Sequence, residues 1–311
     1  MNILTRYDHG IYAIDAHYGA PLIAAVHLIV ENGRVALVDT GHNPAVPQVL
    51  AQMAGLGLHR EQVDYIILTH VHLDHAGAAG TLMQHFPNAQ LVVHPRGARH
   101  MIDPSKLAAA TREVYGEEKT LELYGELVPV AAERVIEAGH EKAVSLAGRQ
   151  LQLFDAPGHA KHHITIRDER TGHFFTGDTF GLSYRHLDAN GRAFVFPTTT
   201  PSQFDPAALH ATVDLIAGYQ PEALYFTHYS QARDVPRLAG DMHRLLDELV
   251  AIAQREKDSG PERQTRICAG ILDLVEREAA EQGWALQGKA AREHMTMDAV
   301  LNAQGLDIWL G

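Results

Sequence analysis

Cysteine and positive charge are both scarce in this sequence. Cys268 is the only cysteine among 311 residues, which excludes an internal disulfide framework and a cysteine-rich zinc site. The chain has 26 lysines and arginines against 38 aspartates and glutamates, so its formal net charge is −12. Nucleic acids and anionic membranes bind basic surfaces, and neither is expected as a partner. A small-molecule substrate and a second copy of the chain, in a homo-oligomer, remain as candidate partners.

Long apolar runs are missing as well. The most apolar early stretch, Ala20 to Val30, includes His27 and is too short to span a bilayer, so it predicts a buried strand. The first ten residues carry Arg6, Asp8 and His9 and lack the apolar segment of a targeting signal. We therefore expect a cytoplasmic protein.

Runs rich in valine, isoleucine and leucine alternate with helix patterns over much of the chain, which is typical of a layered α/β domain. Strands are predicted at residues 11–14, 21–30, 35–38, 64–69, 90–94, 134–137, 150–155, 163–167, 173–176 and 223–227. Helices are predicted at residues 44–56 and 75–86 and from the capping pair Asp205-Pro206.

Two segments show helix patterns without strands. Residues 96–133 predict a helical insertion into the α/β domain. The C-terminal segment predicts helices at residues 236–257, 261–282 and 289–304, punctuated by Gly260-Pro261 and Gly283. We therefore expect an α/β domain over residues 1–235 and a helical extension over residues 236–311.

The sequence is rich in histidine, with 21 in all, and four candidate ligands are gathered in one short string. His70, His72, Asp74 and His75 follow a predicted strand and open a predicted helix. Because strand side chains alternate, His70 and His72 leave the strand end on one side. Imidazole and carboxylate groups suit zinc, iron or manganese, so the string predicts a metal site.

Three later residues extend this pattern. His159, Asp178 and His228 each lie just beyond a predicted strand, where α/β folds commonly place their sites. Each residue alone is more typical of an ordinary turn or core position. Together with the string, they place every candidate ligand at a strand end.

Four features in this order resemble the metallo-β-lactamase superfamily over roughly residues 10–230: the string from His70 to His75, the Pro157-Gly158-His159 run, the Gly177-Asp178 pair and the late His228. The resemblance implies an α/β fold class, a four-layer αββα sandwich in which residues 1–235 form the catalytic domain. It also implies two divalent metal ions as cofactors, with zinc as the default and iron or manganese as alternatives.

The resemblance assigns the metal ligands residue by residue. It implies that the first ion is bound by His70, His72 and His159. It implies that the second ion is bound by Asp74, His75 and His228. Asp178 would bridge the two ions.

Two more residues would orient these ligands. Asp39, in the run Val38-Asp39-Thr40-Gly41, matches an early aspartate motif of the family. Without the resemblance, an aspartate at this position is equally typical of a turn before Gly41. His163 matches the second histidine of a Pro-Gly-His-Thr-x-Gly-His run. Here Ala160 and His162 replace the threonine and glycine of that run, so its local hydrogen bonding differs.

The resemblance implies hydrolysis by a hydroxide that bridges the two ions, with Asp74 as the catalytic residue that holds the nucleophile. True zinc β-lactamases of the commonest type use a cysteine ligand, which this chain lacks near the site. The expected substrate is therefore a small thioester or lactone. The alternatives are a phosphodiesterase of the same superfamily and a metal-bearing regulatory or binding protein whose catalysis is incidental.

Residues 182–204 predict a long loop, and long loops are often functional. Its candidate substrate contacts are Tyr184, Arg185, His186, Phe194 and Phe196. Phe194 and Phe196 favour a substrate with an acyl chain, and Arg185 favours one with a carboxylate or phosphate group. The alternative roles are ordinary loop packing for the aromatic residues and a solvated charge for the arginine.

Overall fold

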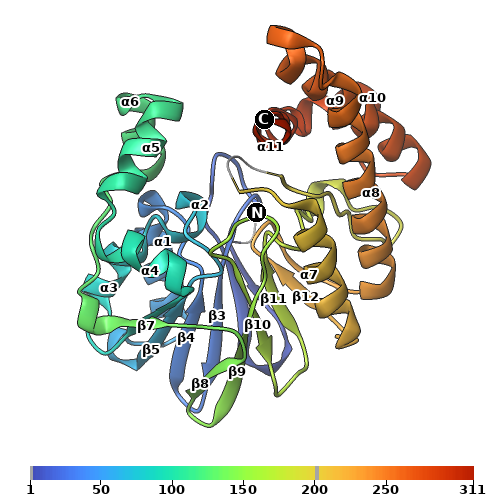
Figure 1. Cartoon of the computed structure of the whole chain (residues 1–311). Helices are drawn as coiled ribbons and strands as arrows, with labels where there is room; N and C mark the ends of the chain where they lie inside the picture. The colour runs from blue at the N-terminus through green and yellow to red at the C-terminus, as the bar shows by residue number, and fades with distance from the viewer. Residues whose placement is uncertain (1–2, 200–202) are drawn as a thin grey trace. The chain divides into compact units, whose positions relative to one another are not determined.

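The computed structural model describes residues 3–199 and 203–311 (Figure 1). The chain divides into two compact units. The first unit comprises Met1–Asp155, His162–Gly177 and Thr227–Ser230, and the second comprises Ala156–Lys161, Asp178–Phe226 and Gln231–Gly311. The division into residues 1–235 and 236–311 stays a prediction.

A seven-stranded sheet organises the first unit. Its strands follow the chain order: β1 (Leu4–Arg6), β2 (Ile11–Asp15), β3 (Ala25–Glu31), β4 (Arg34–Val38), β5 (Val63–Ile67), β6 (Gln90–Val93) and β7 (Val135–Glu137). Strands β1 to β4 pair antiparallel, whereas β4 to β7 pair parallel. The β3–β4 hairpin turns at Asn32 and Gly33, which both have positive φ angles, as a tight two-residue turn requires.

Six helices of the first unit connect or extend these strands: α1 (Val46–Gly55), α2 (Leu73–Ala76), α3 (Ala79–His85), α4 (Pro95–Ile102), α5 (Ser105–Tyr115) and α6 (Glu117–Tyr124). The last three lie in the predicted helical insertion. The expected helix over residues 75–86 is two helices, α2 and α3. They are separated by Gly77 and Ala78, and the φ and ψ of Ala78, −94° and 2°, are not helical.

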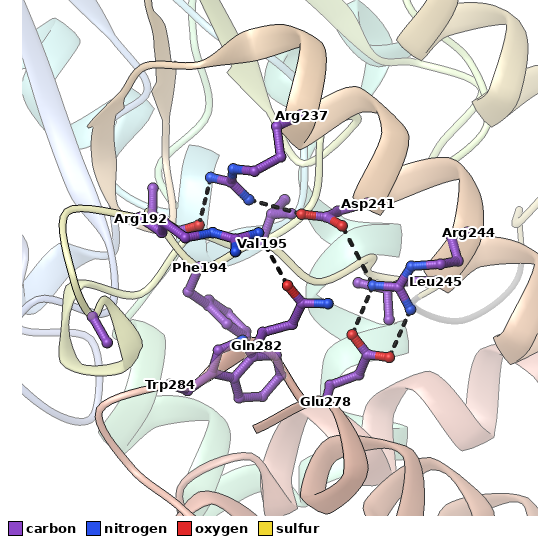
Figure 2. A pocket seen from close by; sticks show the side chains of 12 residues that line it. Arg192, Phe194, Val195, Arg237, Asp241, Arg244, Leu245, Glu278, Gln282 and Trp284 are labelled. Atoms are coloured by element: carbon purple, nitrogen blue, oxygen red, sulfur yellow. Dashed lines mark hydrogen bonds and ion pairs between the residues drawn. The ribbon is translucent and has the colours of Figure 1, made fainter. Parts of the chain in front are cut away.

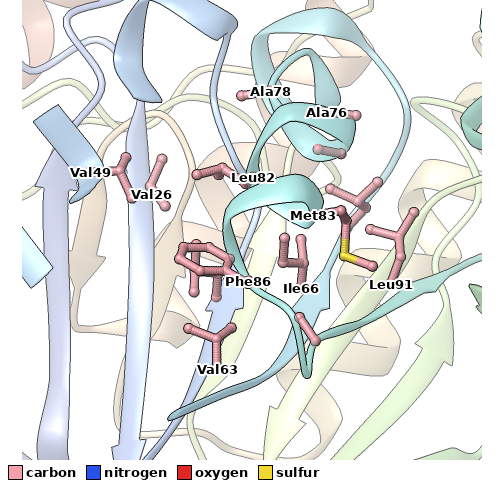
Figure 3. Packing of buried hydrophobic residues seen from close by; sticks show 14 of the residues in the cluster. Val26, Val49, Val63, Ile66, Ala76, Ala78, Leu82, Met83, Phe86 and Leu91 are labelled. Atoms are coloured by element: carbon pink, nitrogen blue, oxygen red, sulfur yellow. The ribbon is translucent and has the colours of Figure 1, made fainter. Parts of the chain in front are cut away.

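The core of this unit lies between α1, α3, α4 and the seven-stranded sheet (Figure 3). Phe86, which follows α3, is fully buried and packs in one cluster with Val63, Ile66 and Leu82. Burying one such side chain stabilises the fold by about 1.5–3 kcal/mol. This packing fixes the position of β5, whose C-terminal end leads into the histidine string.

Four further strands of the first unit pair antiparallel in the order β11-β10-β9-β8: β8 (Lys142–Leu146), β9 (Arg149–Asp155), β10 (Ile164–Asp168) and β11 (Phe174–Gly177). The sequence patterns did not predict β8. Its alternate side chains are exposed, so it lacks the apolar run that marks the buried strands.

The second unit is mainly helical, with α7 (Pro206–Gly218), α8 (Val235–Glu256), α9 (Arg263–Gln282), α10 (Gly288–His294) and α11 (Thr296–Leu310), and it includes β12 (Leu224–Phe226). A short strand, β13 (Ser230–Ala232), follows. The Asp205 side chain caps α7 by accepting from the amide of Ala208 at 3.0 Å. The predicted helix at 289–304 is divided at Met295, whose φ and ψ of −93° and 7° are not helical. Among the described residues, every helix is too short or too polar to cross a bilayer.

Candidate metal centre

The C-terminal ends of β4 and β5 carry the first part of the site. These strands are parallel neighbours, so the residues that follow them, Asp39 and the run from Thr69 to His75, lie at the same sheet edge. The backbone N–H and the hydroxyl of Thr40 both donate to the carbonyl of His75, each at 2.7 Å. These bonds hold α2 against the turn after β4.

Asp39 is a fully buried carboxylate at the centre of a hydrogen-bond network. It accepts from the amide of Thr69 at 2.8 Å, from the hydroxyl of Thr69 at 2.9 Å and from the hydroxyl of Thr227 at 2.7 Å. Its Oδ2 also lies 2.8 Å from Nδ1 of His75. A carboxylate without a proton only accepts, so His75 donates from Nδ1 and carries a lone pair on Nε2.

The same geometry fixes the tautomer of His228. Its Nδ1 donates to the carbonyl of Ile23 at 2.7 Å, which leaves Nε2 with a lone pair. This Nε2 lies 3.2 Å from Nε2 of His75 and 3.3 Å from Oδ2 of Asp74. The third side of the triangle, from His75 Nε2 to Asp74 Oδ2, measures 3.6 Å.

These three atoms fit a divalent ion. Zinc binds nitrogen and oxygen at about 2.0–2.2 Å, so two ligands of a tetrahedral site lie about 3.3 Å apart. Two imidazole lone pairs and a carboxylate oxygen that face one another repel unless a cation lies among them. The donor set of Asp74, His75 and His228 therefore has both the spacing and the charge that a metal ion requires.

A second pair of ring nitrogens lies beside this set. Nε2 of His70 lies 2.8 Å from Nδ1 of His72. The hydroxyl of Thr69, whose proton goes to Asp39, lies 3.2 Å from Nδ1 of His70 and accepts from it. His70 therefore also presents the lone pair of Nε2. The ring of His163 stacks on His70 with ring centroids 4.8 Å apart and an interplanar angle of 21°; its role in orienting His70 stays a prediction.

The second unit contains its own facing pair, His159 and Asp178. Nδ1 of His159 donates to the carbonyl of Thr198 at 3.3 Å, and its Nε2 lies 3.5 Å from Oδ2 of Asp178. Gly158 precedes the histidine with a φ of +126°, and an added Cβ would lie 2.4 Å from the Cα of Leu209. Only glycine fits this turn, so it fixes the path of the chain into His159.

Neighbouring histidines of the first unit carry little positive charge. Burial lowers the pKa of His27 to about 4, against an opposing effect of the Asp39 carboxylate. Burial also lowers the pKa of His42, and the Asp74 carboxylate again opposes the shift. Both rings are neutral at neutral pH, so they do not compete electrostatically with a bound cation.

The structure describes all five candidate substrate residues, and it shows what each one contacts within the second unit. Tyr184 is buried, donates to Asp298 at 3.1 Å and stacks on Phe194. Phe194 also lies edge-on against Trp284, with ring centroids 4.7 Å apart (Figure 2). Phe196 stacks on Phe194, His186 lies against His294, and Arg185 pairs with Asp188 and donates to the carbonyl of Ser183 at 2.9 Å. Their role as substrate contacts stays a prediction.

Figure 2 also shows that two arginines of this region, Arg237 and Arg244, have carboxylate partners, whereas Arg192 donates to the side-chain amide oxygen of Gln282 at 3.1 Å. Arg244 forms two hydrogen bonds with Glu278, at 2.6 and 2.7 Å, which raise the pKa of its guanidinium. Arg237 donates to Asp241 at 2.7 Å. These pairs offset the positive charge locally.

Sequence patterns did not identify several supporting groups. Thr69 and Thr227, the hydroxyl donors to Asp39, each directly precede a predicted ligand, which is the one local signal that could have found them. The sequence pattern includes Gly177 only as the neighbour of Asp178; glycine is required there because an added Cβ would lie 2.5 Å from Nε2 of His163. The carbonyl of Ile23 has no sequence signal at all, because any residue provides one.

Comparison with known families agrees with this geometry. A family model described as the metallo-beta-lactamase superfamily matches residues 19–228. The chain belongs to this superfamily. Similar proteins include the metallo-beta-lactamase fold-containing protein ST1585 of Sulfurisphaera tokodaii, 29% identical over 185 residues, and a hydroxyacylglutathione hydrolase of Xanthomonas campestris, 28% identical over 178 residues. These matches cover 58% and 57% of this chain, but only 63% and 51% of the relatives.

Solved structures of the superfamily share the fold. The family protein TTHA1429 of Thermus thermophilus has a TM-score of 0.68 at 22% identity, over 97% of this chain and 92% of that one. The archaeal protein ST1585 has a TM-score of 0.61 at 24% identity, over 78% of this chain and 87% of that one. The predicted αββα fold class, with its helical insertion and C-terminal helical extension, is confirmed.

Proposed function

We propose that this protein is a metal-dependent hydrolase of small ester-type substrates, a thioester or a lactone. The observation that carries the proposal is the triangle of Asp74, His75 and His228, with sides of 3.2–3.6 Å and no hydrogen available between the two ring nitrogens. Such a set is built to bind a cation, and the superfamily to which the chain belongs supports a hydrolytic use of it.

We propose further that two ions bind, with Asp178 as the bridge. His70, His72 and His159 would hold one ion, and Asp74, His75 and His228 the other. The support is the order of the motifs along the residues that the family model matches, together with the ring nitrogens and carboxylate oxygens described above. Zinc suits this set of nitrogen and oxygen ligands, and iron and manganese remain alternatives.

When bound, the ions would supply activation of water at neutral pH and polarisation of the substrate carbonyl. The protein's own groups accept the proton and orient the ligands. Asp74 is the partly exposed member of its set, with 22% of its side chain accessible, so its carboxylate can reach the attacking water and accept a proton. Asp39 and the carbonyl of Ile23 keep the ring nitrogens of His75 and His228 directed at the site.

The choice of an ester-type substrate rests on two observations. The donor set has no cysteine ligand, since Cys268 lies in α9. Several relatives at about 28–30% identity are named hydroxyacylglutathione hydrolase, so a thioester is the first substrate to test. The expected cytoplasmic location and homo-oligomer stay predictions.

A substrate panel on the metal-loaded protein tests this proposal. Acyl-thioesters, acyl-lactones and aryl esters should be hydrolysed faster than bis-aryl phosphodiesters. The Asp74→Asn variant should lose about 10²–10⁴-fold in rate, the usual range for a positioned acid or base. Asp64→Asn makes the same chemical change at a carboxylate that pairs with Arg34, and it should keep full activity.

Two results would replace the proposal. Faster phosphodiester cleavage would establish the phosphodiesterase alternative. No turnover of any substrate by metal-loaded protein would favour a regulatory or binding role.

A further inference from the structure

A second histidine cluster lies on α7 and α8, within the second unit. His210 and Asp214 are one helical turn apart on α7, and His243 and Asp247 are one turn apart on α8. The two rings stack at 4.9 Å with an interplanar angle of 11°. Their Nδ1 atoms face each other at 2.6 Å.

Each ring is held by a carboxylate of the opposite helix. Nε2 of His210 lies 3.1 Å from Oδ1 of Asp247, and Nε2 of His243 lies 3.0 Å from Oδ1 of Asp214. An ionised carboxylate only accepts, so both rings donate from Nε2. In their neutral form both rings therefore carry the lone pair on Nδ1, and the two lone pairs face each other.

Two facing lone pairs at this distance repel unless a cation separates them. We propose that His210 and His243 form an additional metal site, which binds one zinc-class divalent ion through the two Nδ1 atoms. A metal-bound histidine typically donates its other N–H to a carboxylate, and here both histidines do so. Imidazole nitrogen is a preferred ligand of zinc, copper and nickel.

The geometry needs only a small adjustment to accept the ion. Zinc–nitrogen bonds of about 2.0–2.1 Å place two tetrahedral ligands about 3.3 Å apart, so the Nδ1 atoms must separate by roughly 0.7 Å. The side chains of His210 and His243 are 28% and 29% exposed, which leaves room for the rings to turn and for water to complete the coordination. A bound ion would connect α7 to α8.

Zinc titration of the whole 311-residue chain tests the site. Protein already loaded at the first metal centre is dialysed at neutral pH against increasing free zinc, and bound zinc is counted. We expect one additional zinc ion per chain in the wild type and none in His243→Gln. Zinc should also raise the thermal midpoint of the wild type above that of the variant, because the ion stabilises the folded state.

Two further variants separate this site from general zinc binding. Asp214→Asn and Asp247→Asn should weaken the additional site by about 10–100-fold, the usual effect of removing the carboxylate behind a ligand histidine. His59→Gln removes an exposed histidine of the first unit and should leave the additional ion in place. The proposal is overturned if wild type and His243→Gln bind equal zinc, which would leave a shared proton as the cation between the rings. Equal losses in His243→Gln and His59→Gln would also overturn it.

Discussion

Replacing Asp39 with asparagine tests how the protein directs a ligand histidine. The carboxylate accepts from the amide and hydroxyl of Thr69, the hydroxyl of Thr227 and Nδ1 of His75. An asparagine keeps the shape but offers one oxygen and an NH₂ group. With its oxygen on the Thr69 amide, its NH₂ points at His75 and requires the ring to accept at Nδ1. The proton of His75 then moves to Nε2, the atom that faces Asp74 and His228.

Two estimates of the effect agree. Losing the group behind a ligand histidine weakens metal binding by about 10–100-fold, which corresponds to about 1.4–2.8 kcal/mol. Forcing His75 back to the ligating tautomer leaves a buried N–H facing another donor, and an unsatisfied buried donor costs about 1–3 kcal/mol. We therefore expect Asp39→Asn to bind zinc about 10–100-fold more weakly.

Competition with a chromophoric chelator measures this affinity directly. Asp64→Asn is the matched control: it makes the same substitution on β5, at a carboxylate that pairs with Arg34 and is 27% exposed. It should leave zinc affinity unchanged. A folded Asp39→Asn protein with wild-type zinc affinity would refute the tautomer argument.

Three more predictions concern stability, each measured as the free energy of unfolding in urea. The pKa of His27 is 6.5 in the unfolded chain and about 4 in the folded chain. Between these pH values the unfolded state binds more protons than the folded state. The contribution of His27 to the free energy of unfolding of the wild type should therefore fall by about 3 kcal/mol as pH falls from 6.5 to 4. His27→Gln should lack that part of the slope, and an equal slope in both proteins would contradict the burial argument. Asp168 is fully buried and accepts from Nε of Arg149 at 2.9 Å. Asp168→Asn should therefore lower the free energy of unfolding by about 3–5 kcal/mol. A change below 1 kcal/mol would show that the guanidinium of Arg149 finds other partners. Phe86→Ala should cost about 3–5 kcal/mol because Phe86 is fully buried in the core of the first unit, and a smaller loss would mean that the core collapses into the space.

The candidate ligands could be predicted because their signal is local. Alternation along a strand and a turn into a helix place His70, His72, Asp74 and His75 together without any knowledge of the rest of the fold. The strands β4 and β5 were equally clear, because parallel buried strands are continuous apolar runs. The helical insertion and extension followed from helical periodicity over long segments.

The resemblance implied Asp39 and His163 as orienting residues, but the hydrogen-bond partners of Asp39 and His228 could not be predicted, because they come from distant parts of the chain. Thr227 bonds to Asp39 across 188 positions, and the carbonyl of Ile23 bonds to His228 across 205. The helix break at Met295 could not be predicted either, because methionine is a good helix former. The contact between the rings of His210 and His243 depends on how α7 packs on α8, which the sequence does not show. Pairing between elements, unlike periodicity within one, has no signature in a single sequence.

The number of tightly held metal ions tests the central claim most directly. Wild type, His75→Ala and Asp178→Ala are each loaded with zinc and then dialysed at low free zinc, so that weaker sites empty, before metal is counted by elemental analysis. We predict about two ions per chain in the wild type and a clear loss in both variants. Wild-type protein without tightly held metal, or variants that retain the wild-type amount, would contradict the account.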